Sequence, residues 1–313
     1  MTTKSVICLM GPTASGKTDV AMRLSDDFPV DLVSVDSALV YRGMDIGTAK
    51  PEPELLIRYP HALVNICDPE KTYSVGDFVR HTIREIRSSH ERCRIPLLVG
   101  GTMMYFRSLI NGISELPEAD PIVRAEIDNE AHKVGWSSLH QQLSIIDPAA
   151  AARINKNDSQ RIQRALEVYR VSGRCLTEWQ QTTLVQGDFI YSKYALLPEP
   201  RKRLHERIEK RLDRMLDSGF MEEVKGLKAR PNLTAKHSSM RAVGYKQIWS
   251  HLNGDISFRQ AREQILAATR QLAKRQITWL RTESEITMLN PLEVDPYVSI
   301  SAAVKLLMKD VRN

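Results

Sequence analysis

Near its beginning the chain reads Gly11-Pro12-Thr13-Ala14-Ser15-Gly16-Lys17-Thr18. This stretch fits the pattern G-x-x-x-x-G-K-[ST] and directly follows an apolar run, so it predicts a strand, a glycine-rich turn and a helix that begins near Lys17. The two glycines let successive backbone N–H groups turn inward, and the helix points its positive dipole end at the same place. The stretch therefore predicts a loop that binds a di- or triphosphate, with Lys17 on the outer phosphate and the Thr18 hydroxyl placed to reach Mg²⁺.

Short apolar runs recur along the first third of the chain and alternate with helical stretches such as residues 75–89. The runs lie at residues 6–10, 32–35, 63–67 and 95–99. This alternation predicts an α/β fold of the P-loop type, in which a mostly parallel sheet is flanked by helices. Ligands bind beyond the carboxyl ends of the strands in such sheets. Polar residues follow three of the runs directly, and we expect them to meet at one edge of the sheet: the phosphate loop, Asp36-Ser37 and Gly100-Gly101-Thr102.

The pattern changes near residue 115. Residues 116–121 are rich in turn formers, and from there to about residue 191 the apolar spacing is helical, with no clear strand. We therefore predict a helical insertion domain at 115–194 and a P-loop catalytic core made from 1–114 and 195–313. In the second part of the core we expect a strand at 194–197 and two long helices. Gly219 ends the first helix, and a capping box of Ser257 and Gln260 opens the second.

Composition sets the broad class of the protein. The chain has 313 residues, of which 42% are hydrophobic and 26% charged, as in a soluble globular protein. Its apolar runs fall short of the roughly 20 residues that a membrane span needs. Four widely spaced cysteines without a C-x-x-C pair argue against a disulfide framework or a zinc site, so we expect reduced thiols in a cytoplasmic protein.

Basic residues are concentrated in three segments, 160–174, 201–214 and 270–281, and the last of these contains no acidic residue. Any one such segment is typical of a solvated helix face. Three in one chain, with Tyr169 and Trp279 interleaved among the arginines, favour a surface that binds nucleic acid, because guanidinium groups bind phosphates and aromatic rings stack on unpaired bases.

The choice between phosphate chemistries depends on the residues beside the loop. A kinase or NTPase usually has a strand that ends in an acidic Mg²⁺ ligand. Here the run at 95–99 ends in Gly100-Gly101-Thr102, and Asp36 is the best-placed carboxylate. This set suits a reaction in which an acceptor gives a proton to Asp36 while it attacks a carbon that bears a diphosphate. Three alternatives stay open: Asp36 as a direct Mg²⁺ ligand, a small-molecule or nucleoside kinase, and a P-loop RNA-binding regulator without chemistry.

Six stretches make the chain resemble the tRNA dimethylallyltransferases, the bacterial type of the tRNA isopentenyltransferase family. They are GPTASGKT at 11–18, DSALVYRGMDIGTAKP at 36–51, LVGGT at 98–102, DSQRIQRALE at 158–167, VGYKQ at 243–247 and TRQLAKRQITWLR at 269–281. The resemblance implies an enzyme that needs Mg²⁺ and transfers a dimethylallyl group from dimethylallyl diphosphate to tRNA. The acceptor it implies is the N6 amine of the adenosine next to the anticodon on its 3′ side, in tRNAs that read codons beginning with U.

The same resemblance implies roles for the residues that match. Asp36 is the general base, Thr102 contacts the substrates near the transfer point, and residues 11–18 hold the prenyl diphosphate rather than ATP. The target base is flipped out of its stack. The implied partners are the anticodon stem-loop and the prenyl donor. We expect the enzyme to be a monomer that does not bind membranes. The implied tRNA contacts are Asp36, Ser37, Ala38, Leu39, Thr102, Arg124, Gln160, Arg161, Ile162, Gln163, Arg164, Arg241, Ala242, Val243, Gly244, Tyr245, Lys246, Lys274, Arg275, Gln276, Ile277, Thr278, Trp279, Leu280 and Arg281.

Two departures from the family pattern are visible. Leu39 stands where the family often has Gln, which removes one polar contact near the base, and Met103-Met104 stand where it often has Gly-Leu, which alters the prenyl pocket. Arg207 and Arg211 are a separate open question, because each is either a partner of the diphosphate or a surface arginine. Spacing does not decide between the two, and surface arginines are the commoner case.

Overall fold

The computed structural model describes residues 5–114, 116–182 and 188–312. These residues form two compact units. One is made from both ends of the chain, up to Ile110 and again from Asp188, and the other is the segment between them, Asn111–Gly187.

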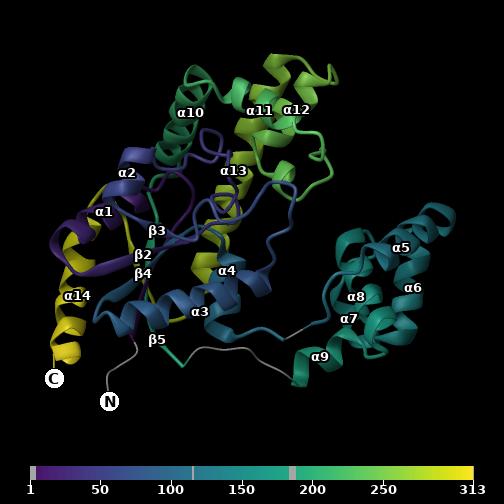
Figure 1. The fold of residues 1–313 in the computed structure, drawn as a ribbon, viewed down its shortest axis with the longest axis horizontal. Helices are drawn as coiled ribbons and strands as arrows, with labels where there is room; N and C mark the ends of the chain where they lie inside the picture. The colour runs from purple at the N-terminus through teal and green to yellow at the C-terminus, as the bar shows by residue number, and fades with distance from the viewer. Residues whose placement is uncertain (1–4, 115, 183–187, 313) are drawn as a thin grey trace. The chain divides into compact units, whose positions relative to one another are not determined.

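A six-stranded sheet in the order β3-β2-β4-β1-β5-β6 forms the centre of the first unit (Figure 1). Its strands are β1 (Ser5–Met10), β2 (Val30–Val35), β3 (His61–Ala62), β4 (Ile95–Gly100), β5 (Ile190–Leu196) and β6 (Ile286–Leu289). Every neighbouring pair is parallel, which confirms the predicted α/β fold. Because β4 lies between β1 and β2, the three polar segments that follow these strands share one edge of the sheet, as the sequence predicted.

Helices cover both faces of this sheet. The helices of the unit are α1 (Lys17–Asp27), α2 (Pro53–Arg58), α3 (Val75–Glu91), α4 (Met103–Asn111), α10 (Arg201–Asp217), α11 (Phe220–Lys228), α12 (Tyr245–Leu252), α13 (Phe258–Thr282) and α14 (Pro296–Arg312), with a 3₁₀ turn at Ser239–Arg241. On one face α1 and α14 enclose a core that includes Ile7, Leu97 and Val304. From the other face α3 packs against β2 and β4. The central strands are buried on both sides for this reason, and they read as unbroken apolar runs.

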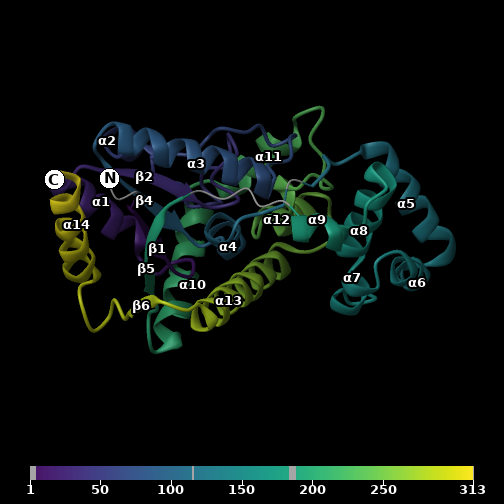
Figure 2. The ribbon, with the colours of Figure 1, turned by 90° about the horizontal axis from the view of Figure 1, so that it is seen from below.

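Helices α10 to α13 pack on one another in sequence, and the long helix α13 passes beside α10 and α12 (Figures 1 and 2). The capping box predicted before α13 is present, because the Ser257 hydroxyl accepts from the Gln260 N–H and the Gln260 side chain accepts from the Ser257 N–H. Gly219, predicted to end the first long helix, lies between α10 and α11 with a φ of 95°. A positive φ of this size is the conformation that glycine adopts without strain.

One predicted strand is wrong. Residues 63–67 do not form a strand, and the sheet has only the two-residue β3 just before them. Leu63 and Asn65 adopt positive φ angles of 65° and 56°, which turn the chain away from an extended path. The backbone N–H groups of Asn65 and Ile66 instead donate to the carbonyls of Leu39 and Val40. The apolar run therefore supports the loop after β2 rather than lengthening the sheet. The strand expected at 194–197 does form, and it begins earlier, at Ile190.

The second unit is helical throughout its named elements, as the sequence predicted for this part of the chain. Its helices are α5 (Pro121–Val134), α6 (Trp136–Ile146), α7 (Pro148–Arg153), α8 (Ser159–Ser172) and α9 (Leu176–Thr182). They enclose a small core that includes Ile127, Leu139 and Ile162. Below the surface, the fully buried carboxylate of Glu167 accepts two hydrogen bonds from Arg124, one from Arg164 and one from the Asp120 N–H.

No helix in the described ranges is long and apolar enough to cross a lipid bilayer.

Candidate active site

The phosphate loop has the conformation that its glycines predict. Gly16 has a φ of 94° and caps the start of α1, and Ala14 also takes a positive φ of 62°. A Cβ on Gly11 would lie 2.8 Å from both the Leu196 carbonyl oxygen and the Ser15 hydroxyl, so the backbone passes too close to its surroundings for any other residue. The resulting concave backbone at the start of a helix is an anion site.

Lys17 is folded into this loop. Its ammonium group donates to the carbonyls of Gly11 at 3.0 Å and Pro12 at 2.8 Å, and it lies 3.4 Å from the Ser15 hydroxyl. Removal from water lowers the pKa of Lys17 to about 7, Asp36 acts in the opposite direction, and Arg211 and Arg207 lower the pKa further. A phosphate oxygen that enters the loop would raise the pKa of Lys17, because a nearby negative charge favours the protonated form.

Arg211 belongs to the loop's surroundings rather than to the open surface. Its guanidinium group reaches from α10 and donates to the Thr13 hydroxyl at 3.2 Å and to the Thr48 carbonyl at 3.1 Å. Burial lowers the pKa of Arg211 below its ordinary value, with Asp36 opposing that shift. The guanidinium of Arg207 lies against Gly16, because a Cβ placed there would be 3.4 Å from it. The sequence did not decide whether these arginines lie at the surface or beside the phosphate, and only the path of α10 shows that both lie next to the loop.

Asp36 and Thr102 lie on adjacent strand ends. Val35 of β2 is in register with Gly100 of β4, and a Cβ on Gly100 would come within 2.0 Å of the Val35 carbonyl oxygen. This close approach allows the Thr102 hydroxyl oxygen to accept from the N–H of Ser37, at 3.0 Å. The two residues that the sequence singled out are therefore neighbours at the edge where the phosphate loop also lies.

The carboxylate of Asp36 has one oxygen held by the backbone. Its Oδ1 accepts from the Ala38 N–H at 2.8 Å and from the Leu39 N–H at 3.3 Å. No described residue hydrogen-bonds to Oδ2. The turn that follows β2 therefore orients the carboxylate and leaves its second oxygen without a hydrogen bond from the described residues, as a general base requires.

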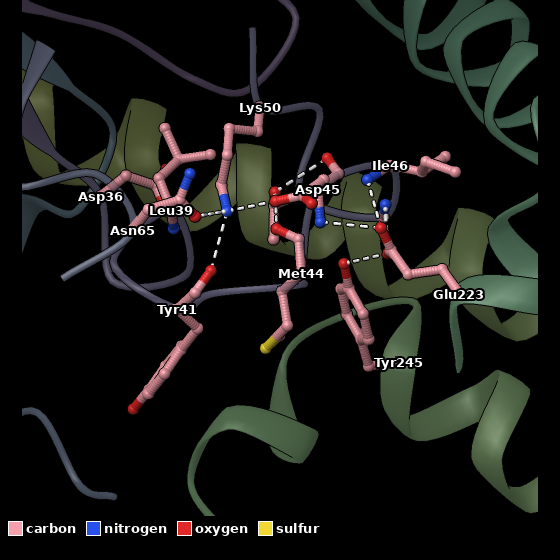
Figure 3. Close-up of polar contacts among 12 residues, drawn as sticks. Asp36, Leu39, Tyr41, Met44, Asp45, Ile46, Lys50, Asn65, Glu223 and Tyr245 are labelled. Carbon is pink, nitrogen blue, oxygen red and sulfur yellow. Dashed lines mark hydrogen bonds and ion pairs between the residues drawn. The ribbon is translucent and has the colours of Figure 1, made fainter. Parts of the chain in front are cut away.

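The loop from Asp36 to Pro51 is fixed by two polar clusters, built around the buried Lys50 and the half-buried Glu223 and shown in Figure 3. In the first, the Lys50 ammonium donates to the Tyr41 carbonyl, the Asp45 carboxylate and the Asn65 side-chain oxygen at 2.8, 2.5 and 2.6 Å. Burial lowers the pKa of Lys50, and Asp45 opposes this shift. Each of the three ammonium protons thus has an acceptor, as a buried lysine requires.

The second cluster centres on Glu223 of α11. Its carboxylate accepts from the backbone N–H groups of Asp45, Ile46 and Gly47 at 2.8, 2.7 and 3.1 Å, and from the Tyr245 hydroxyl at 2.5 Å. A Cβ on Gly47 would lie 2.0 Å from the Phe220 ring, so the loop and α11 are in close contact there. Glu223 therefore anchors the far end of the loop that begins at Asp36. Nothing in the sequence alone pointed to this carboxylate.

Some of the residues implied as tRNA contacts are exposed, some are buried and the rest are half-buried. The exposed ones are Ser37, Gln160, Arg161, Arg241, Lys246, Lys274, Arg275, Thr278 and Arg281. The buried ones are Ile162, Gly244, Tyr245, Gln276, Ile277 and Leu280. Their roles at the RNA stay predictions, and the exposed set is the one whose side chains face solvent in the described structure. Arg124 and Arg164 are half-buried, since both are bound to Glu167.

Gln276 has a different setting from the rest of its segment. Its side-chain oxygen accepts from the Thr13 N–H of the phosphate loop at 3.0 Å, and its amide nitrogen donates to the Gly101 carbonyl at 2.7 Å. The residue thus links the two loops that flank the site, from a helix more than 170 positions further along the chain.

Metal binding by protein side chains alone finds no support in the described ranges, which hold no group of three or more histidine, cysteine or acidic side chains close enough to share an ion. A hydroxyl such as Thr18, which is exposed in the first turn of α1, is the type of single protein ligand that Mg²⁺ uses when substrate phosphates and water supply the others. The residues present therefore fit a metal that arrives with a diphosphate.

Comparisons with known proteins show the family to which the chain belongs. The family model of IPP transferase matches residues 39–283, which is more than half of the chain. A tRNA dimethylallyltransferase from Alkalilimnicola ehrlichii is 51% identical over 285 residues, covering 91% of this chain and 90% of that protein. The chain therefore belongs to the IPP transferase family and is a prenyltransferase, as the sequence motifs predicted.

Solved structures show the same relationship. The full-length tRNA isopentenylpyrophosphate transferase from Bacillus halodurans is 33% identical, with a TM-score of 0.70 and coverage of 99% of this chain and 97% of that one. A eukaryotic dimethylallyltransferase acting on tRNA is 27% identical, with a TM-score of 0.75 and coverage of 96% of this chain and 78% of that one. The kinase alternative finds no support in any of these relatives.

Proposed function

We propose that the chain transfers a dimethylallyl group from dimethylallyl diphosphate to the N6 amine of the adenosine next to the anticodon on its 3′ side, in tRNAs that read codons beginning with U. Dimethylallyl transfer to tRNA follows from family membership. The choice of donor, base and tRNAs is the further step. The observation that supports it is the pair Asp36 and Thr102 beside the phosphate loop, where a kinase would have a metal-binding acid.

In this mechanism Asp36 is the general base. As the adenosine nitrogen attacks C1 of the prenyl group, its N–H proton passes to Oδ2 of Asp36, and the bond between C1 and the bridging oxygen breaks. The products are N6-dimethylallyladenosine and diphosphate. The backbone N–H groups of Ala38 and Leu39 hold Oδ1, so the base keeps one orientation through the step. The Thr102 hydroxyl, oriented by the Ser37 N–H, contacts the substrates at the transfer point.

The leaving group lies in the phosphate loop. Residues 11–18 bind the diphosphate through backbone N–H groups and Lys17, and Arg207 and Arg211 add positive charge at the same end. The Thr18 hydroxyl would hold a divalent ion, which we propose to be Mg²⁺, together with the diphosphate, and the bound ion would supply positive charge against the leaving group. The pKa of Lys17 is about 7, so the charge on this group depends on pH near neutrality.

The tRNA occupies surfaces on both parts of the chain. We propose that the unit made from both ends of the chain is the catalytic core, and that the helical unit, Asn111–Gly187, contacts the anticodon stem-loop. The predicted boundary at 194 lies too late, because β5 begins at Ile190 and belongs to the core sheet. Exposed Arg161, Lys274 and Arg275 are suited to phosphates, and the target adenosine is flipped out of its stack because a stacked N6 amine offers no line of attack. We further propose that the protein acts as a monomer in the cytoplasm, where its four free cysteines would stay reduced.

Mass analysis of an anticodon stem-loop oligonucleotide tests this function. The oligonucleotide is incubated with the protein, dimethylallyl diphosphate and Mg²⁺, and a matched oligonucleotide with another base next to the anticodon is the control. The proposal predicts one added prenyl unit on the adenosine and none on the control. ATP consumption without RNA, and no prenyl gain, would instead indicate a kinase.

A further inference from the structure

We propose that Gln276 is a positioning residue for prenyl transfer, which sets the spacing between the phosphate loop and the Gly101-Thr102 turn. The inference rests on the proposed function, because these two loops hold the leaving group and contact the acceptor. Only the resemblance to the family places Gln276 among the tRNA contacts. The residues around Gln276 instead indicate a role in positioning the two loops.

The amide of Gln276 is buried, and each of its two ends makes a hydrogen bond. The residue is 8% exposed. The Thr13 N–H can only donate and the Gly101 carbonyl can only accept, so these partners define which end of the amide faces which loop. A solvent-facing contact with RNA would require both hydrogen bonds to break, which would leave the buried Gly101 carbonyl unpaired.

Gly101 makes the room for this contact. A Cβ added at Gly101 would lie 2.6 Å from the Gln276 amide nitrogen. The contact therefore requires both a glycine at position 101 and the amide of Gln276. They join elements that are 175 residues apart in sequence.

The linkage continues on either side of the amide. Thr13 connects the amide to the cationic end of the site, because the Thr13 hydroxyl accepts a hydrogen bond from Arg211. Beyond Gly101, the Thr102 hydroxyl accepts from the N–H of Ser37, the residue after the proposed base. A shift at Gln276 would therefore change the distance between the breaking bond and the base, and a displacement of about 1 Å can cost about a hundredfold in rate.

Two substitutions separate the effects. Gln276→Leu removes both hydrogen bonds while keeping most of the volume. Gln276→Glu keeps the shape and the acceptor toward Thr13, but as a carboxylate it cannot donate to the Gly101 carbonyl. When protonated, the same side chain can donate again. The matched control is Gln264→Glu, which places the same change on an exposed position of α13.

The measurement is single-turnover prenyl transfer at saturating stem-loop RNA and saturating donor, across a range of pH, with each rate divided by that of the unsubstituted protein. We expect about a hundredfold loss for Gln276→Leu at every pH. For Gln276→Glu we expect a similar loss at about pH 8 that shrinks as the pH falls toward the carboxyl pKa, which is ordinarily about 4.3 and is raised by burial. Gln264→Glu should stay near a ratio of one.

A thermal melt of each variant shows whether it is folded at the assay temperature. The proposal is overturned if folded Gln276 variants transfer at the unsubstituted rate, or if their only defect is a raised KM for RNA, which is the result of a direct RNA contact. A Gln276→Glu ratio that does not change with pH also contradicts it. In each of these cases the unsubstituted protein still prenylates RNA, so the proposed function is tested separately.

Discussion

Binding of the prenyl diphosphate should draw a proton onto Lys17. The ammonium group is held under the loop by the Gly11 and Pro12 carbonyls, and its pKa in the free protein is about 7. At about pH 8 such a group is about nine-tenths neutral, and at about pH 6 about one-tenth. Diphosphate oxygens stabilise the charged form and raise the pKa. We therefore expect uptake of about 0.9 proton for each donor bound at pH 8 and about 0.1 at pH 6.

The sign of the affinity change follows from the same shift. Below about pH 7 the lysine is already charged and the donor binds with full affinity. Above that pH, Lys17 must first be protonated, which costs about 1.4 kcal/mol at pH 8. Binding therefore weakens about tenfold for each further pH unit. The loss stops once the pH exceeds the pKa of Lys17 in the complex.

Titration calorimetry measures this proton uptake. Donor is titrated into protein in two buffers with different ionisation enthalpies, and the difference in heat gives the number of protons bound. Lys17→Arg is the control, because arginine stays charged and should show almost no uptake at pH 8. Uptake near zero in the unsubstituted protein, or equal uptake in Lys17→Arg, would refute the assignment of the proton to Lys17.

Three further predictions concern other parts of the molecule. Gly100→Ala should lower the free energy of unfolding by about 3 kcal/mol or more in a denaturant titration, because its Cβ would lie 2.0 Å from a β2 carbonyl. Arg211→Lys should raise the KM for the prenyl diphosphate about tenfold in steady-state kinetics with little change in kcat, since one ammonium group cannot reproduce the two hydrogen bonds of the guanidinium to Thr13 and Thr48. Glu167→Gln should destabilise the helical unit by about 2–3 kcal/mol in a circular-dichroism melt and weaken stem-loop binding, because two partly exposed arginines lose a buried counter-charge. An unchanged unfolding free energy, KM or melt, respectively, would contradict each of these expectations.

Local patterns were enough to predict the sheet and the meeting of three strand ends. The apolar runs before Gly11, Asp36 and Gly100 have the length and composition of buried strands, and parallel strands place their carboxyl ends together. The same signal failed at residues 63–67, because an apolar run does not tell a strand from a buried loop. There the positive φ angles of Leu63 and Asn65 decide the path.

Contacts between distant segments could not be read from the sequence. The positions of Arg211 and Gln276 depend on how α10 and α13 pack against the phosphate loop, and no local spacing encodes that packing. Glu223 is a similar case, since the donors to its carboxylate are backbone N–H groups of a loop more than 170 positions earlier. Helix patterns show which face is apolar, whereas the partner of a polar side chain emerges only from the folded structure.

The central claim is that Asp36 takes the N6 proton while the phosphate loop holds the leaving diphosphate. Single-turnover transfer to the anticodon stem-loop by Asp36→Asn tests it most directly, with RNA affinity measured on the same variant. The asparagine keeps the side-chain shape and an oxygen for the Ala38 and Leu39 N–H groups but cannot accept the proton. We predict a rate lower by about 10²–10⁴-fold with RNA binding almost unchanged. Transfer at the unsubstituted rate would contradict the account.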